Sequence, residues 1–358
     1  MSETGSLSPS FWRERLAPYA QPRLSRSIFD VATSAVPYVI VTGAMYALYG
    51  QVSYWIVLAL GVLAAGFLLR TFIVFHDCGH GSFIANRRAN KVVGITCAIL
   101  TYQAYHPWSY EHAVHHATSG DLDKRGKGDV ETITAREYRE MSWLGRLGYR
   151  LMRNPVVMLV LGPLWSLLLE PRLLPKWSRK RFWRQIVATD VVVVAILATL
   201  VALFGWKAVL AVQLPSAMIA GGAGVFMFYV QHQFEGVYWV RHEEWSYAES
   251  ALKGSSYLKL PKVLQFFTGN IGLHHVHHLH PRIPNYNLQA AHDDNPVFHD
   301  VPTLGIFSGL KTFRLKVYDE DQGQMVTFAG ARRHHARTVR HAAPLTKAET
   351  ADVVIGGG

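Results

Sequence analysis

The sequence predicts an all-α integral membrane protein in which four transmembrane helices form two hairpins under a cytoplasmic, histidine-rich cap. Three observations predict this fold class. Half of the 358 residues are apolar and only 17% are charged, which leaves too little polar surface for a water-soluble chain of this length. Four segments are long and apolar enough to cross a bilayer, and three clusters of histidine stand near the ends of apolar segments.

Each predicted span has close to the ~20 apolar residues that a helix needs to cross a bilayer. The spans cover residues 31–49, 54–75, 186–204 and 208–230. Little more than "GQVS" joins the first two and "GWK" joins the last two, so each pair forms a tight hairpin that returns the chain to the side it came from. Two other apolar stretches, 92–104 and 156–169, are too short to span comfortably. They are interpreted either as re-entrant or interfacial segments or as core helices.

Basic residues predict the orientation in the membrane. They crowd the N-terminal segment, the stretch after the second span and the approach to the third, whereas the hairpin tips hold only Lys207. Because Lys and Arg concentrate on the cytoplasmic side, both termini and the long loops are predicted to be cytoplasmic, in a multi-pass protein of the cytoplasmic (inner) membrane. The net charge of +11 is therefore a topology signal, and no nucleic-acid partner is expected. The basic residues before the third span, which are also candidates for docking an acidic partner, are Arg172, Lys176, Arg179, Lys180, Arg181 and Arg184.

Two terminal segments flank the membrane domain, which is assigned to residues 31–325. Residues 1–30 form a cytoplasmic segment without a secretory signal. It is expected to be disordered or interfacial, with aromatic residues such as Trp12 touching lipid headgroups. Residues 326–358 have no apolar period and end in glycines, which predicts a disordered C-terminal tail.

Nine histidines are the candidate metal ligands, and the predicted topology brings them all to one side of the membrane. On a helix, residues at i, i+3 and i+4 share a face, so the spacings H-x3-H and H-x2-H-H present two and three imidazoles together. Imidazole suits iron, copper, zinc or nickel, and nine ligands are too many for one ion, so two metal ions are predicted. Zinc, which is usually four-coordinate, would need few of them. The nine residues are His76, His80, His112, His115, His116, His232, His274, His277 and His278.

Three carboxylates lie close to these histidines in the sequence. Asp77, Glu111 and Glu235 could each accept the outer ring proton of a ligand and so fix its tautomer. The alternative for each of them is a solvated loop carboxylate. His275 is left out of the ligand set because it does not give the spacing of the third cluster.

The motifs "HDCGHGSF", "EHAVHH" and "HHVHHLHPRIPNYNL" resemble the three histidine boxes of the membrane fatty-acid desaturases. The resemblance covers about residues 27–300. The stretches "HATSGDLDKRGKGDV" and "YVQHQFEG" are similar to bacterial members of the acyl-lipid, omega or delta-12-like branch. The resemblance to this family implies a mushroom-shaped fold in which the nine histidines hold two iron ions. His232 matches the lone histidine between boxes two and three. Animal relatives add an asparagine four residues before it, where this chain has Phe228, so the second iron lacks one of the ligands that those relatives have.

The resemblance also implies a reaction. Members of this family are oxygen-dependent oxidoreductases that introduce a cis double bond into a fatty acyl chain, here the chain of a membrane lipid. Two irons make from dioxygen the strong oxidant that an unactivated methylene requires. The sequence holds neither a haem-binding "HPGG" motif nor a nucleotide-binding domain. The electron donor is therefore expected to be a separate protein, a ferredoxin with its reductase.

Three alternatives remain open at this point. Hydroxylation, epoxidation or carotenoid modification on the same scaffold would use the same boxes. An intramembrane zinc protease is suggested by the likeness of "HDCGH" to H-E-x-x-H, but Asp77 stands where the general base should be glutamate, and the other boxes would be unused. A metal transporter needs polar groups at the bilayer midplane, and the four spans hold almost none, since Asp30 and Arg70 sit at span ends.

Overall fold

The computed structural model of the chain describes residues 8–126, 128–172 and 176–342. Four of the described helices are long and apolar enough to cross a membrane. They cover Leu24–Leu48, Tyr54–Gly79, Arg181–Phe204 and Trp206–His232. The four predicted spans and the all-α fold class are therefore confirmed. The second and fourth helices continue past the predicted ends, and these extra residues include His76 and His232.

The first span consists of two helices, α2 (Leu24–Ala32) and α3 (Ala35–Leu48), and the other three are α4 (Tyr54–Gly79), α10 (Lys176–Phe204) and α11 (Trp206–His232). The shorter α-helices are α1 (Pro9–Leu16), α5 (Arg87–Leu100), α6 (Tyr105–Thr118), α7 (Ala135–Glu140), α8 (Trp143–Met152), α9 (Gly162–Leu164), α12 (Tyr247–Lys253), α13 (Lys262–Phe267), α14 (His274–Leu279), α15 (Asn285–Asp293), α16 (Ile306–Thr312) and α17 (Phe328–Ala342). Short 3-10 or π turns are η2 (Ala17–Ala20), η3 (Val157–Leu161), η4 (Trp165–Leu169), η5 (Glu170–Arg172), η6 (His242–Glu244) and η7 (Pro296–Phe298). The strands form two small sheets, in which β1 (Tyr257–Leu258) pairs in parallel with β2 (Thr303–Leu304) and β3 (Val317–Asp319) pairs antiparallel with β4 (Gln324–Val326).

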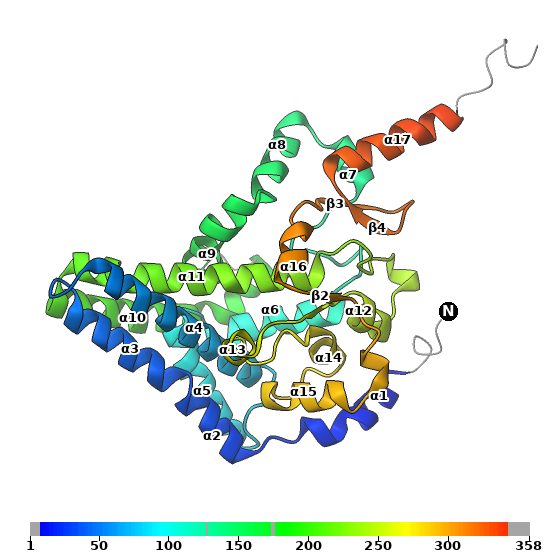
Figure 1. Cartoon of the computed structure of the whole chain (residues 1–358). Helices are drawn as coiled ribbons and strands as arrows, with labels where there is room; N and C mark the ends of the chain where they lie inside the picture. The colour runs from blue at the N-terminus through cyan, green and yellow to red at the C-terminus, as the bar shows by residue number, and fades with distance from the viewer. Residues whose placement is uncertain (1–7, 127, 173–175, 343–358) are drawn as a thin grey trace, which may run out of the picture.

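Helix α4 is the centre of the bundle. Figure 1 shows α3, α4, α10 and α11 side by side, with α6, α12, α14 and α15 at one end, which we call the cap. In the most apolar stretch of α4, half of the residues are buried inside the protein. In the corresponding stretch of α10 only 11% are buried, so α10 faces outward over most of its surface. Glycines permit the close packing of α4. A Cβ atom at Gly61 would lie 3.3 Å from Met45 Cε, and one at Gly66 would lie 2.8 Å from the ring of Phe267.

The two short apolar stretches pack against the spanning helices. In the first, α5 contacts α4 and α6, and its Cys97 and Ala98 are buried, which supports the core-helix interpretation. In the second, η3, α9 and η4 form an irregular helix that lies along α11. A Cβ atom at Gly221 of α11 would lie only 2.8 Å from Pro163 Cβ, so the small residue is required for this contact.

The N-terminal segment does not match the prediction of a disordered or lipid-touching tail. Ser8 caps the start of α1, and its side chain accepts a hydrogen bond from the backbone N–H of Phe11. Trp12 is only 2% exposed and stacks on Phe298, with ring centroids 6.3 Å apart. Arg15 Nε also donates to Asn295 Oδ1 at 2.8 Å. From Ser8 onward the segment is ordered because its aromatic and basic side chains find partners beside the cap.

The predicted disordered tail is also partly wrong. Residue 326 ends β4, and α17 follows it from Phe328 to Ala342. Phe328 stacks on Tyr138 with ring centroids 4.8 Å apart, and Ala331 is 4% exposed in the same cluster. One apolar face at helical spacing is enough to dock a helix whose other residues are polar. The absence of a long apolar pattern in this segment therefore does not imply disorder. The part of the predicted tail at 343–358 lies outside the described residues.

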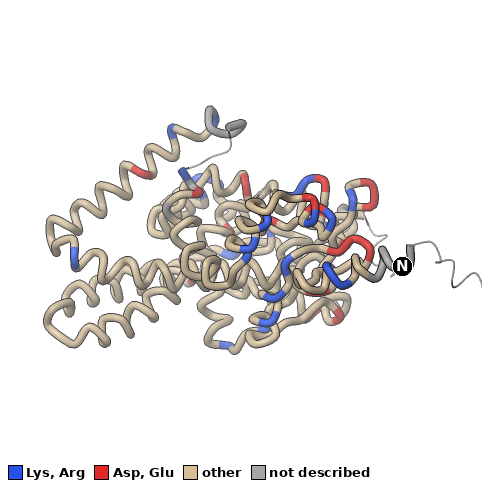
Figure 2. Tube along the Cα trace, turned by 90° about the horizontal axis from the view of Figure 1, so that it is seen from above, with Lys and Arg blue, Asp and Glu red and all other residues tan. Residues whose placement is uncertain are grey.

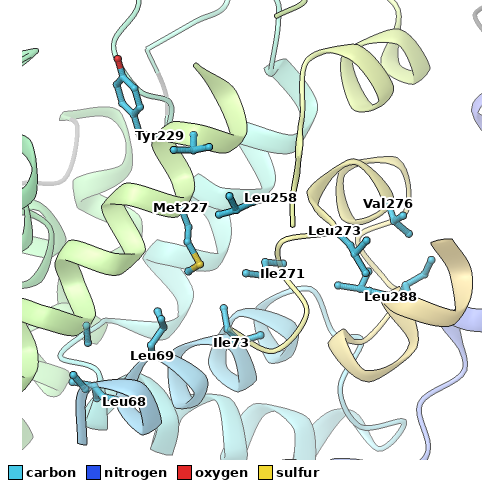
Figure 3. Packing of buried hydrophobic residues seen from close by; sticks show 14 of the residues in the cluster. Leu68, Leu69, Ile73, Met227, Tyr229, Leu258, Ile271, Leu273, Val276 and Leu288 are labelled. Carbon is cyan, nitrogen blue, oxygen red and sulfur yellow. The ribbon is translucent and has the colours of Figure 1, made fainter. Parts of the chain in front are cut away.

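The apolar core runs from the spans into the cap. Figure 3 shows Leu69 and Ile73 of α4 and Met227 of α11 meeting Ile271 and Leu273, which precede α14. Charged residues lie mostly around the cap, and the far ends of the spanning helices carry few of them, as Figure 2 shows. The shared core fixes the ends of α4 and α11 relative to α14, and these are the elements that carry histidines.

Candidate metal centre

Four elements bring the nine predicted histidines together. His76 and His80 lie at the C-terminal end of α4, and His232 is the last residue of α11. Because α4 and α11 pack side by side, both ends lie at the same end of the bundle (Figure 1). The second cluster lies on α6 and the third on α14, both in the cap. Residues up to about 200 positions apart in the sequence thus meet in one place.

The histidines form two separate groups, and in each group the ligand atoms all lie within 4.8 Å of one another. The five-histidine group consists of His76, His80, His112, His116 and His277. The four-histidine group consists of His115, His232, His274 and His278. Every one of the nine predicted histidines belongs to one of the groups, and His275 belongs to neither. Instead, His275 Nε2 lies 3.1 Å from His292 Nδ1.

Helix geometry explains how each H-x2-H-H motif is divided. Successive residues of an α-helix are rotated by about 100°, so positions i and i+4 point within about 40° of each other, whereas i+3 and i+4 differ by about 100°. His112 and His116 accordingly enter the five-histidine group, while His115 enters the other. In the third cluster the i and i+4 pair, His274 and His278, enters the four-histidine group. Each motif therefore serves two sites at once.

The ring nitrogens of each group converge. In the five-histidine group, His112 Nε2 lies 3.0 Å from His76 Nε2 and 3.2 Å from His116 Nε2. The Nε2 atom of His116 lies in turn 2.9 Å from that of His277. In the four-histidine group, His274 Nε2 lies 2.9 Å from that of His232 and 3.1 Å from that of His278. Nitrogen ligands at about 2.1 Å from one ion and at right angles to each other would lie about 3.0 Å apart. The observed spacing fits such a ligand set.

The protonation of these rings also fits metal binding. A histidine binds a metal only as the neutral imidazole. Burial, followed by the neighbouring histidines, lowers the pKa well below the ordinary value of 6.5 for six of the rings that lie outside the spans. Among the buried ring nitrogens without a hydrogen-bond partner are His80 Nε2 of the five-histidine group and His115 Nε2 of the four-histidine group, together with the Nδ1 atoms of His116, His274 and His277. Buried polar atoms usually have one, and a metal ion at each group would supply it to the two Nε2 atoms. The six rings are His80, His112, His116, His274, His277 and His278.

Three outer hydrogen bonds fix the tautomers of ring nitrogens. His76 Nδ1 donates to Asp77 Oδ1 at 3.0 Å, and His115 Nδ1 donates to Asp129 Oδ1. His232 Nδ1 lies 3.3 Å from the backbone oxygen of Gly254. The acceptors carry no hydrogen, so each Nδ1 holds the proton and each Nε2 is left free to bind a metal.

Of the three predicted carboxylates, only Asp77 forms such a bond. Glu111 lies in the wall of the neighbouring cavity, where burial and then the charge of Glu170 raise its pKa to about 7. Glu235 is exposed, and its backbone oxygen accepts from Met325 N. The hydrogen bond that His115 donates to Asp129 is not predictable from the sequence, because Asp129 stands 14 positions from His115 in a loop and no helical spacing connects the two.

An apolar cavity of about 310 Å³ opens beside both histidine groups. His76 and His112 of the first group and His274 of the second line it. On α4 the lining runs from His76 back to Leu68, which is eight residues or about 12 Å along a helix. The rest of its wall includes Phe72, Ile73, Ala104, Pro107, Trp108, Ala217, Ala220, Gly221, Gly224, Val225 and Phe228. The arrangement thus places two histidine groups that could hold metal ions at the end of a slot between the spanning helices.

Comparison with known proteins gives consistent matches. The family model described as fatty acid desaturase matches residues 53–304. A fatty acid desaturase of Bacillus subtilis (strain 168) is 42% identical over 315 residues, which cover 88% of this chain and 89% of that protein. An sn-1 acyl-lipid omega-3 desaturase (ferredoxin) of Nostoc sp. (strain 36) is 25% identical over 279 residues, 76% of this chain and 75% of the relative. An sn-1 oleoyl-lipid 12-desaturase of Synechocystis sp. is 28% identical over 244 residues, 63% of this chain and 64% of the relative.

Proposed function

This chain belongs to the fatty acid desaturase family, and we propose that it introduces a cis double bond into the acyl chain of a membrane lipid, using two iron ions held by the nine histidines. As a member of this family it is an oxidoreductase of lipid metabolism. The acyl-lipid substrate is supported by the named activities of the cyanobacterial relatives.

The observation that carries the proposal is the cavity that touches both histidine groups. Its apolar wall lies between spanning helices, where a lipid tail is already dissolved. His76 and His112 from one group and His274 from the other line the same space. A methylene in this cavity would therefore stand beside two metal ions, and the apolar wall would keep water away from it.

The chain's own residues have three tasks in this reaction. When bound, the iron pair supplies the oxidising power from dioxygen that an unactivated C–H bond requires. Trp108 stacks on His112 with ring centroids 4.5 Å apart and also lines the cavity, so it holds a ligand ring and shapes the slot at once. Asp77 and Asp129 keep protons on the outer nitrogens of their histidines, which leaves the inner nitrogens to bind metal.

The donor set favours iron over zinc. Nine neutral imidazoles in groups of five and four exceed what two four-coordinate zinc sites would use. Nitrogens about 3 Å apart also fit ligands at right angles around a six-coordinate ion better than a tetrahedron, in which they would be about 3.4 Å apart. Iron is moreover redox-active, as removal of hydrogen requires.

We further propose that the protein lies in the cytoplasmic membrane with both termini and the cap in the cytoplasm, and receives electrons there from a separate ferredoxin with its reductase. Two cyanobacterial relatives carry ferredoxin in their names. Arg181 and Arg184, near the start of the third span, are exposed and could meet an acidic donor, whereas Arg172 already pairs with Asp190 at 2.9 Å.

Salt screens surface charges beyond about 10 Å at 0.1 M, so turnover with ferredoxin should fall as salt rises. Charge reversal at Arg181 and Arg184 should raise the apparent KM for the donor. A KM that neither salt nor these substitutions change would leave the basic residues as topology signals only.

Product analysis tests the reaction itself. The chain is expressed in a host that lacks such an activity, and the fatty acids of its membrane lipids are separated by gas chromatography and identified by mass spectrometry. The expected result is a new cis-unsaturated acyl chain that is absent with His277→Ala. Hydroxylated or epoxidised acyl chains, or modified carotenoids with no new double bond in the acyl chains, would show that the scaffold performs a different oxidation.

A further inference from the structure

A line of buried polar side chains joins the end of the second span to the histidines. Arg70 and Asp77 lie seven residues, or two turns, apart on α4 and so share one face of the helix. Arg70 is 7% exposed, Asp30 of α2 is 3% and Asn285 at the start of α15 is 2%. Buried charges cost free energy unless each of them has partners, so this arrangement needs an explanation.

The hydrogen bonds of this line are continuous. Arg70 Nη2 donates to Asp30 Oδ1 at 2.8 Å, and Asn285 Nδ2 donates to Asp30 Oδ2 at 2.9 Å. The same nitrogen donates to Asp77 Oδ2 at 3.0 Å, and the backbone N–H of Asn285 donates to that oxygen at 2.7 Å. Asp77 Oδ1 accepts in turn from His76 Nδ1. Three helices thus contribute to one line that ends at a predicted ligand.

Asn285 is the centre of this arrangement. Its amide nitrogen lies between two carboxylates, whose negative charges would repel each other without a donor between them. Asp30 is held in turn by Arg70, which lies over the Phe266 ring at 4.2 Å from the centroid and donates to the Phe266 backbone oxygen. With Asp30 and Arg70 in place, Asn285 has only one orientation that serves both carboxylates, and this orientation positions Asp77.

We propose that Asp30, Arg70 and Asn285 are positioning residues of the five-histidine group, which hold Asp77 so that His76 keeps its proton on Nδ1 and presents Nε2 to a metal ion. The inference rests on the proposed metal centre. An outer partner of a metal-binding histidine typically changes the metal affinity by 10–100-fold. Because the line ends at His76, its effect is confined to the five-histidine group, whereas Asp129 and Gly254 hold rings of the other group.

Asn285→Leu tests the inference, because it keeps the size of the side chain and removes the two hydrogen bonds that the side-chain nitrogen donates, so that only the backbone N–H still donates to Asp77. Asn287→Leu is the matched control. Asn287 lies two residues further along α15 and is 6% exposed, but its hydrogen bonds go to the Arg23 side chain and the Tyr19 backbone. Fe²⁺ is titrated without oxygen into metal-free purified protein, and the affinity of each bound ion is measured.

The expected result is that Asn285→Leu lowers the affinity for one of the two Fe²⁺ ions about tenfold or more and leaves the affinity for the other unchanged. Asn287→Leu should leave both affinities as in the wild type. Equal weakening by both variants, or no weakening by Asn285→Leu, would overturn the inference. If Asn285→Leu does not accumulate, Asp30→Asn carries the same test, since Asp30 bonds to no histidine. A wild-type protein that binds no Fe²⁺ would instead overturn the proposed metal centre. If the wild type binds two Fe²⁺ ions and Asn285→Leu binds both of them equally tightly, only the inference about the positioning residues fails.

Discussion

Gly224 offers a test of whether the cavity holds the acyl chain. It lies on α11 in the cavity wall, and a Cβ atom at this position would meet no heavy atom within 4 Å. The first carbon of a leucine side chain would therefore displace no protein atom, and the rest of the side chain would extend from the cavity wall. Replacing an interior helical glycine also favours the helix by up to about 1 kcal/mol, so Gly224→Leu should not impair folding.

The expected magnitude follows from the space that the leucine side chain occupies. Its four carbons displace about four methylene groups of the substrate, and each buried methylene contributes about 0.8 kcal/mol. The loss of about 3 kcal/mol corresponds to a decrease of about 200-fold in kcat/KM. Acyl chains short enough to end before Gly224 should lose less, which would shift the product profile towards shorter chains.

The assay measures the initial rate of product formation per amount of enzyme in host membranes, at low concentrations of the acyl substrate. Gly43→Leu is the control, because Gly43 is also in a spanning helix and also has open space at its Cβ position, but does not line the cavity. A Gly224→Leu rate within about twofold of the wild type would refute the assignment of this cavity. An equal decrease in both variants would show that any bulky residue in a span is harmful.

Three further outcomes are expected. His115→Ala and His277→Ala, one from each histidine group, should each abolish product and lower the bound iron, while both proteins still fractionate with membranes, because neither side chain lies in a span. In metal-free protein, the six buried histidines with lowered pKa stay neutral just below pH 6.5, where the unfolded chain takes up protons. The free energy of unfolding should therefore decrease as the pH falls below 6.5, by up to about 1.4 kcal/mol per pH unit for each histidine, and a melting temperature that does not change there would contradict this reasoning. Reporter fusions at Gln51 and Lys207 should report the outside and one at Gly323 the cytoplasm, whereas a cytoplasmic signal at Gln51 would contradict the proposed orientation.

The spans could be predicted from the sequence because burial in lipid leaves a local signal. A run of about 20 apolar residues identifies a spanning helix without any knowledge of its neighbours. The same signal failed at the two termini. Trp12 is buried against Phe298 and Phe328 is partly buried against Tyr138, and both partners are far away in the sequence, so neither segment shows the long apolar pattern of a helix that folds by itself.

The histidines show the same division between local and distant information. Spacing predicted which residues share a helix, and the structure brings all nine into two groups. The split of His115 from His112 and His116 follows from the rotation of about 100° per residue, and it could have been predicted from the same spacing. The pairing of His277 with His116, at 2.9 Å, joins residues 161 positions apart and has no such local signal.

The buried polar residues of the spans were the least predictable feature. Asp30 and Arg70 stand at span ends in the sequence, where charges are expected to face water, yet they pair at 2.8 Å, and both are almost fully buried. Their partner Asn285 follows the third histidine cluster in the sequence, and its position there gives no sign of the two carboxylates that it contacts. A pair of opposite charges on two different helices is recognisable only when the packing of those helices is known.

The number of iron ions bound per chain tests the central claim most directly. The protein is purified from membranes after expression in iron-supplied cells, and its metals are measured by elemental analysis against the protein concentration. Two groups of converging imidazoles predict about two irons per chain. One tightly bound zinc and no iron would contradict the account and favour a hydrolytic site.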